Sequence, residues 1–126
     1  MNERGIKVMT TIDLFRNAAD RIYFSAGHTI FEEGQPGDVM YVVTEGEVYV
    51  LVHDKIIYSI GPGGILGEMA LIDTQPRSAT AVAKTACKLV PINEKRFVFL
   101  VQQTPFFAIE VMRIIAERLR NMDARL

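Results

Sequence analysis

The sequence predicts an α+β domain that is mainly β: an antiparallel β-roll or jelly roll, of the double-stranded β-helix type, with helices flanking it at both ends. Between residues 20 and 91, short apolar runs alternate with regularly spaced Gly and Pro turns, as in antiparallel barrels and jelly rolls. Helical patterns occupy only the two ends. We therefore expect a single domain over residues 1–126, with a helical segment at 1–19, the roll at 20–91 and C-terminal helices at 93–126.

A short helix at 10–19, capped by Thr10 or Thr11, comes first, and the strands of the roll follow with a turn after each. Glycine and polar residues place these turns at 33–38, 45–47, 53–55 and 61–64. The strands expected between and after them cover residues 39–43, 48–52, 56–60, 78–83 and 86–91.

Two helices are expected after the roll. Asn93 is a suitable N-cap for a helix at 94–102, and Thr104-Pro105 is a good start signal for a second helix. Arg113, Glu117 and Arg120 lie on the polar side of this last helix. Its apolar face carries Phe107, Val111, Ile114, Ile115 and Met122, with Leu119 near the edge.

Composition sets limits on the class of protein. The chain has 14 Lys and Arg against 15 Asp and Glu, which gives a formal net charge of −1. It therefore lacks the excess of basic residues that is typical of nucleic-acid-binding domains. We expect no DNA or RNA binding by this chain alone. No apolar run approaches the roughly 20 residues that span a bilayer, so no membrane partner is expected. The single Cys87 cannot form an internal disulfide, which favours a reducing compartment, the cytoplasm.

The stretch that carries chemistry is residues 63–81. Glycines precede a single helical turn at 68–72, and the first N–H groups of such a turn are free to bind an anion. Arg77 follows, with a planar fork that matches a phosphate, and Ser78 adds a hydroxyl donor. Glu68 repels a free phosphate but accepts a hydrogen bond from a sugar hydroxyl. The combination therefore suits a sugar phosphate.

The run Gly67-Glu68-Met69-Ala70-Leu71-Ile72-Asp73-Thr74-Gln75-Pro76-Arg77-Ser78-Ala79 resembles the phosphate-binding cassette of the cyclic-nucleotide-binding domain family. That family includes bacterial catabolite activator proteins, regulatory subunits of cAMP-dependent kinase and cyclic-nucleotide-gated channels. The turns at 34–38 and 46–47 also resemble the family's turn glycines. With the helical ends, the resemblance covers nearly the whole chain.

The resemblance implies a role for each cassette residue. Glu68 is expected to bind the ribose 2′-hydroxyl, Arg77 to pair with the cyclic phosphate and Ser78 to hydrogen-bond it, while N–H groups of Ala70 and Leu71 face the phosphate. The base is expected to rest on apolar side chains of the roll under the last helix. No metal and no cofactor beyond this ligand are expected. The implied ligand-binding residues are Gly67, Glu68, Met69, Ala70, Leu71, Arg77, Ser78 and Ala79.

The chain departs from the family pattern at two places. Leu66 stands where the family commonly has Phe, and the segment 118–123 lacks the hydroxyl residues that bacterial cAMP activators place against adenine. Asn121 or Asp123 are the candidate substitutes. Ser78 resembles cAMP-binding bacterial regulators, whereas cGMP-selective kinases have Thr there. The sequence therefore favours cAMP, with cGMP as the other candidate.

Three classes of function follow. The first is a sensor whose C-terminal helix closes over the nucleotide and signals to a partner or fused domain. The second is a degenerate, non-binding domain that acts as a protein-interaction scaffold. The third is an enzyme, a sugar-phosphate isomerase or hydrolase, for which Glu68 is the one candidate base; we expect no enzyme. Arg77 also has a purely structural interpretation, in which it pairs with Glu68 or Asp73 and ties the roll together.

Overall fold

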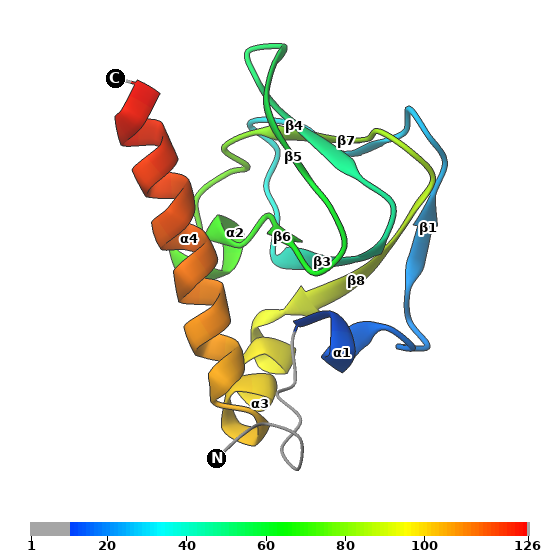
Figure 1. Cartoon of the computed structure of the whole chain (residues 1–126), viewed down its shortest axis with the longest axis vertical. Coiled ribbons are helices and arrows are strands. Elements are labelled where there is room, and N and C mark those ends of the chain that lie inside the picture. Colours follow the sequence, from blue (N-terminus) through cyan, green and yellow to red (C-terminus); the bar gives the residue numbers. More distant parts are fainter. Residues whose placement is uncertain (1–10, 126) are drawn as a thin grey trace, which may run out of the picture.

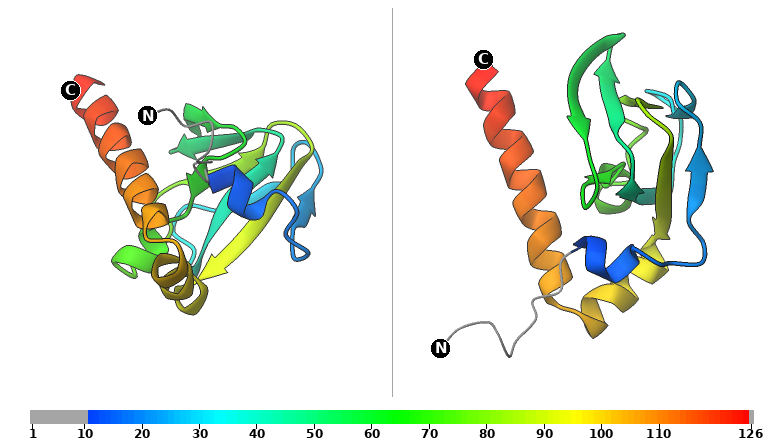
Figure 2. Two further views of the ribbon diagram at one scale, coloured as in Figure 1. Left: turned by 60° about the horizontal axis from the view of Figure 1, so that its bottom comes forward. Right: turned by 45° about the vertical axis from the view of Figure 1, so that its right-hand side comes forward.

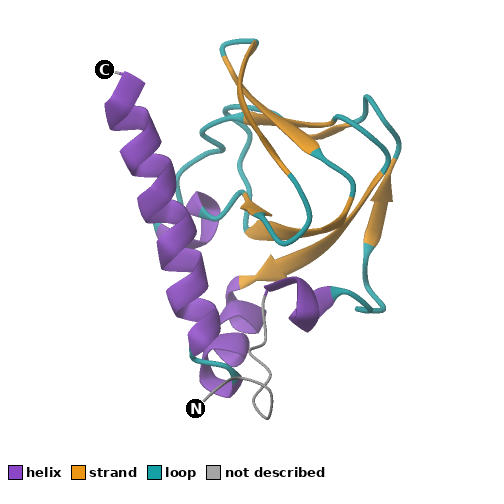
Figure 3. Cartoon of the chain, viewed as in Figure 1, coloured by secondary structure: helices purple, strands orange, loops and turns teal. Residues whose placement is uncertain are grey.

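The computed structural model describes residues 11–125, with side chains from 13 to 121. Its strands form two four-stranded antiparallel sheets, in the orders β1-β8-β3-β6 and β2-β7-β4-β5. The sheets face each other as a roll, and the helices lie at one end and along one side of it (Figures 1 and 3). This confirms the predicted fold class, a mainly β roll with flanking helices.

The predicted strands all occur, with ends within two residues of the predicted ones; β1, β2 and β6 are short additions. The strands are β1 (Ile22–Phe24), β2 (Thr29–Phe31), β3 (Val39–Glu45), β4 (Val48–Val52), β5 (Lys55–Ile60), β6 (Ile65–Leu66), β7 (Thr80–Ala83) and β8 (Cys87–Asn93). The helices are α1 (Thr11–Phe15), α2 (Met69–Ile72), α3 (Glu94–Gln103) and α4 (Phe106–Arg125).

The first helix is shorter than expected. It ends at Phe15, whose carbonyl accepts a hydrogen bond from the Ala18 N–H at 2.9 Å in a tight turn. Thr10, one of its two candidate caps, lies outside the described residues.

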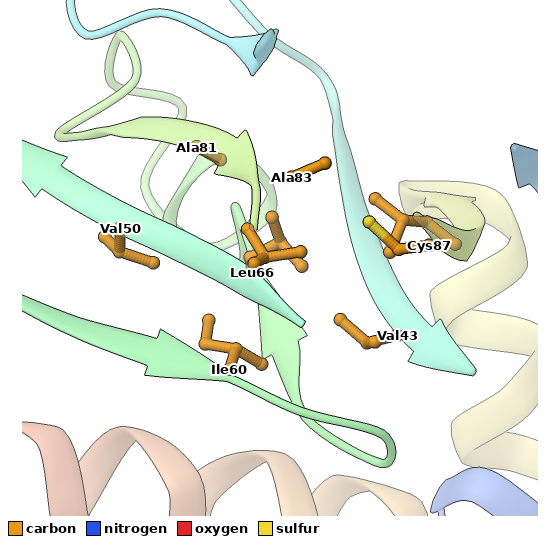
Figure 4. Close-up of a cluster of buried hydrophobic side chains, with 9 residues drawn as sticks. Val43, Val50, Ile60, Leu66, Ala81, Ala83 and Cys87 are labelled. Carbon is orange, nitrogen blue, oxygen red and sulfur yellow. The ribbon is translucent and has the colours of Figure 1, made fainter. Parts of the chain in front are cut away.

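The sheet that contains β3 and β8 is buried on both faces. Its side chains therefore contribute to two cores, one inside the roll and one under the helices. Figure 4 shows the inner core, which consists of Val43, Val48, Val50, Ile60, Leu66, Ala81, Ala83, Cys87 and Leu89. The second core consists of Phe15, Met40, Val42, Ile65, Val90, Ile92, Phe107 and Val111. Side chains of α1 and α4 thus anchor the helices to the roll.

The C-terminal helices start where the sequence predicts. The Asn93 side chain caps α3 by accepting a hydrogen bond from the Arg96 N–H at 2.8 Å. Helix α4 begins directly after Thr104-Pro105. No single helix in residues 11–125 combines the length and hydropathy needed to cross a membrane; α3 and residues 106–121 of α4 meet that test only as a pair bent by 118°.

Helix α4 runs alongside the roll and past α2 (Figure 2). Its residues Phe107 and Val111 are buried, and Phe107 meets the ring of Phe15 edge-on with ring centroids 5.9 Å apart. The predicted apolar face is confirmed at these positions, whereas Leu119 is 57% exposed. The Met122 side chain lies outside the described residues.

Candidate ligand-binding site

The cassette joins strand β6 to strand β7 and contains α2 as its single helical turn. Gly67 links β6 to this turn with φ +74°, in the left-handed region that favours glycine. A Cβ at Gly67 would lie 2.6 Å from Arg77 Nη1 and 3.3 Å from Phe31. Glycine is therefore required here, both for the backbone conformation and for the close approach of Arg77.

Arg77 is the buried cation of the site. The residue is only 7% exposed, and its Nη1 donates to the Gly67 carbonyl at 3.2 Å. The guanidinium carbon lies 4.2 Å from the centroid of the Phe31 ring, a cation–π contact. Burial lowers the pKa of the Arg77 guanidinium, and the nearby Tyr41 and Asp38 partly offset this effect.

The surroundings of Arg77 do not match the purely structural interpretation. Among the described residues neither Glu68 nor Asp73 pairs with Arg77, and its Nε is buried without a hydrogen-bond partner. A buried donor without a partner costs about 1–3 kcal/mol. An anion bound at this guanidinium supplies acceptors that the folded chain itself does not provide.

The backbone donors of the cassette are arranged differently from the expectation. The N–H groups of Ala70 and Leu71 already donate within the turn, to the carbonyls of Gly67 at 3.2 Å and Glu68 at 3.0 Å. Within the described residues the N–H groups of Glu68 and Met69 have no acceptor. The donors left available are thus those nearest the start of α2.

Glu68 is paired with a residue from the far end of the chain. Its side chain is 11% exposed, and its Oε1 accepts a hydrogen bond from Arg118 Nη1 at 3.0 Å. Arg118 Nη2 also donates to the Ile65 carbonyl, and its guanidinium carbon lies 5.3 Å from the centroid of the Tyr58 ring. Burial raises the pKa of Tyr58, while the charge of Arg118 lowers it and that of Glu68 raises it further.

These groups line one pocket with a cavity volume of about 40 Å³. Of the predicted residues, Leu71 does not line it and instead packs against the core under the helices. Ser78 is exposed and lines this pocket together with the other predicted residues Gly67, Glu68, Met69, Ala70, Arg77 and Ala79. The remaining lining residues were not predicted from the sequence; they are Phe31, Val50, Tyr58, Leu66, Pro76 and Arg118.

Arg118 is the charged residue that sequence reasoning missed. Its signal is its spacing, because it follows Phe107, Val111 and Ile114 at intervals of three and four residues and so continues the buried face of α4. A cation at the end of an apolar stripe indicates a buried partner. Asn121, one of the two candidates for base recognition, is exposed and does not line the pocket, and the Asp123 side chain lies outside the described residues.

Comparison with known proteins identifies the family of the chain. Residues 21–104 match the family model of the cyclic nucleotide-binding domain, and the chain therefore belongs to the cyclic-nucleotide-binding domain family, a family of regulatory domains. The predicted family resemblance is thereby confirmed. Arg118 lies beyond the matched residues, so the family match by itself assigns it no role.

Three similar proteins illustrate the relationship. The cyclic AMP receptor protein of Thermus thermophilus is 31% identical over 120 residues, which is 91% of this chain and 56% of that protein. A cyclic nucleotide-gated potassium channel of Mesorhizobium japonicum is 39% identical over 99 residues, which is 79% of this chain and 27% of the channel. The crystal structure of Thermus thermophilus catabolite activator protein superposes with a TM-score of 0.78 at 29% identity, covering 98% of this chain and 60% of that one. The chain thus spans between about a quarter and three fifths of these relatives.

Proposed function

We propose that this domain is a cAMP sensor. In the proposed complex Arg77 pairs with the cyclic phosphate, the Ser78 hydroxyl donates to it, and Glu68 accepts a hydrogen bond from the ribose 2′-hydroxyl. One observation carries the proposal: Arg77 is buried in the pocket with an unsatisfied Nε donor and no carboxylate partner among the described residues. A buried guanidinium with an unpaired donor is suited to bind an anion.

The preference for cAMP over cGMP rests on two supports. Ser78 at the cassette follows the pattern of cAMP-binding bacterial regulators, and the relative from Thermus thermophilus is named a cyclic AMP receptor protein. The base has apolar and aromatic surface to rest on, from Val50, Tyr58 and Leu66. Flat aromatic and aliphatic walls accept either purine, so base preference is a point for measurement.

Helix α4 is the element proposed to carry the signal. It contributes Arg118 to the pocket, so ligand binding changes the surroundings of the helix. If the ligand makes better contacts with one position of α4 than with another, its binding shifts the population of molecules toward that position. The receiver is a partner protein or a fused domain, and the sensor is placed in the cytoplasm, without nucleic-acid binding by this chain alone.

The two other classes of function fit these observations less well. A non-binding scaffold has no need for a buried arginine with an unsatisfied donor beside a carboxylate in one pocket. For an enzyme, Glu68 is the candidate base, but its Oε1 is held by Arg118 at 3.0 Å.

Calorimetric titration with cAMP and with cGMP, side by side, tests the proposal. We expect one ligand per chain and tighter binding of cAMP. Arg77→Ala should weaken cAMP binding by about tenfold or more, because a charge-assisted hydrogen bond contributes about 1.5–3 kcal/mol. Arg120→Ala, which removes an exposed cation of α4, is the control. Absence of binding to folded, nucleotide-free protein would favour the scaffold, and product formation from cAMP would favour the enzyme.

A further inference from the structure

Phe31 is the aromatic residue of the pocket that contacts Arg77. The centroid of its ring lies 4.2 Å from the Arg77 guanidinium carbon, inside the distance of about 6 Å at which a cation and an aromatic ring attract each other. The ring is itself stacked on that of Tyr41, with centroids 6.2 Å apart and an angle of 22° between the ring planes. Phe31 comes from β2 and Tyr41 from β3, so both sheets of the roll hold the ring in place.

The same segment of the chain also holds the Arg77 backbone. The Gly34 N–H donates to the Arg77 carbonyl, and the Arg77 N–H donates to the Gln35 carbonyl, both at 2.8 Å. Gly34 and Gln35 lie in the turn that follows β2, whose last residue is Phe31. Residues 31–35 thus fix Arg77 at both ends, the backbone through hydrogen bonds and the guanidinium through the ring. A side chain that is fixed before the ligand arrives loses little conformational entropy on binding.

The ring stabilises the guanidinium charge without using its hydrogen-bond donors. An aromatic ring attracts a cation through the negative charge of its π face, and this attraction needs no N–H group. A carboxylate partner would accept two of the N–H groups and would compete with an anion for them. In the part of the chain that the structure describes, Nη1 donates to the Gly67 carbonyl and Nε has no partner. The contact with Phe31 therefore leaves donors of Arg77 available to a ligand.

We infer that Phe31 is a positioning residue for phosphate binding: its ring keeps the buried Arg77 guanidinium in the pocket while leaving its donors free for the phosphate. The inference rests on the proposed function, because Phe31 acts on the ligand of the same pocket through Arg77. Two other roles compete with it, since Phe31 also lines the pocket and packs against the inner core. In the first, Phe31 contacts the base of the nucleotide directly; in the second, it only fills space in the fold.

The test compares the dissociation constants of cAMP and cGMP for the wild type, Phe31→Leu, Phe31→Tyr and Tyr49→Leu. Phe31→Leu keeps an apolar side chain but removes the ring, so it should weaken both nucleotides by the same factor, about fivefold or more. Phe31→Tyr keeps the ring and should bind both within about twofold of the wild type. Tyr49→Leu is the matched control and should leave both dissociation constants unchanged. The centroid of the Tyr49 ring lies 5.3 Å from Lys84 Nζ, on the same sheet as Phe31 but away from the residues that line the pocket.

A double-mutant cycle shows whether Phe31 acts through Arg77. In the Arg77→Ala background, Phe31→Leu should change cAMP binding by less than about twofold, because no guanidinium is left to position. A direct contact with the base would keep its effect in this background, or would change the ratio of the cAMP and cGMP dissociation constants in Phe31→Leu. Either result overturns the inference.

The remaining outcomes separate the inference from the proposed function. If Phe31→Leu binds both nucleotides like the wild type while Arg77→Ala does not, Phe31 only fills space and the sensor assignment stands. If the wild type binds neither nucleotide, both are wrong. Urea unfolding of each variant establishes that it is folded under the conditions of the titration. Phe31→Met is the second variant, for the case in which Phe31→Leu does not fold; it also lacks the ring, so wild-type affinity in Phe31→Met overturns the inference.

Discussion

Substitution of Gly37 by alanine tests the role of Arg77 without altering Arg77 itself. A Cβ at Gly37 would lie 2.3 Å from Arg77 Nε, 2.4 Å from Cζ and 2.7 Å from Nη2. Carbon atoms in contact lie about 3.5–4.0 Å apart, so the guanidinium must move by about 1 Å or more. Because φ at Gly37 is outside the left-handed region, alanine adds no backbone strain there.

The expected result is a loss of affinity that exceeds the loss of stability. The displaced group is the end of a flexible side chain, so overpacking should lower the free energy of unfolding by about 1–3 kcal/mol. Displacing the guanidinium from the phosphate should forfeit a charge-assisted hydrogen bond, about 1.5–3 kcal/mol. This corresponds to roughly 10- to 150-fold weaker binding of cAMP. Calorimetric titration and urea unfolding of the same preparation measure the two quantities.

Gly27→Ala is the matched control. Gly27 has φ +86° and no atom within 4 Å of an added Cβ, so alanine should cost about 1 kcal/mol of stability through backbone strain alone. We expect it to bind cAMP as the wild type does. The reasoning is refuted if Gly37→Ala also binds like the wild type, or if both variants lose affinity equally.

Two further predictions concern the core. Phe107→Ala should lower the free energy of unfolding by about 3–5 kcal/mol, because Phe107 is fully buried between Phe15 and Phe97. Phe99 is 58% exposed, so Phe99→Ala should change the free energy of unfolding by less than about 0.5 kcal/mol. Urea unfolding measures both variants, and equal losses of stability in Phe107→Ala and Phe99→Ala would contradict the observed packing. Burial raises the pKa of the Cys87 thiol. The thiol should therefore react with a thiol reagent at pH 8 only as fast as the folded chain opens. The contribution of this pKa shift to the free energy of unfolding is fully present below the pKa of the thiol in the unfolded chain, about 8.5. It is lost as the pH rises through the pKa of the thiol in the folded chain. In Cys87→Ala the free energy of unfolding should not show this decrease with pH.

The local elements were predictable because local chemistry determines them. The Asn93 cap and the Thr104-Pro105 start depend on groups within one helical turn, and both helices begin at the predicted places. The strands followed from the spacing of glycine turns. The short strands β1 and β6 were missed because only their pairing with β8 and β3 makes them strands. Such pairing joins residues far apart in the sequence and leaves no local pattern.

The sequence by itself determined the family, the cassette and the assignment of Arg77 and Glu68 to a pocket, because the cassette is one continuous segment with rigid spacing. Only the tertiary structure decided which cation neutralises Glu68. Arg118 lies 50 residues away on α4 and reaches Glu68 because Phe107 and Val111 anchor that helix to the core. The tertiary structure also turned Leu71 away from the pocket, since it packs under the helices. Contacts of this kind depend on how separate elements pack, and a linear pattern of residues does not encode that arrangement in any one place.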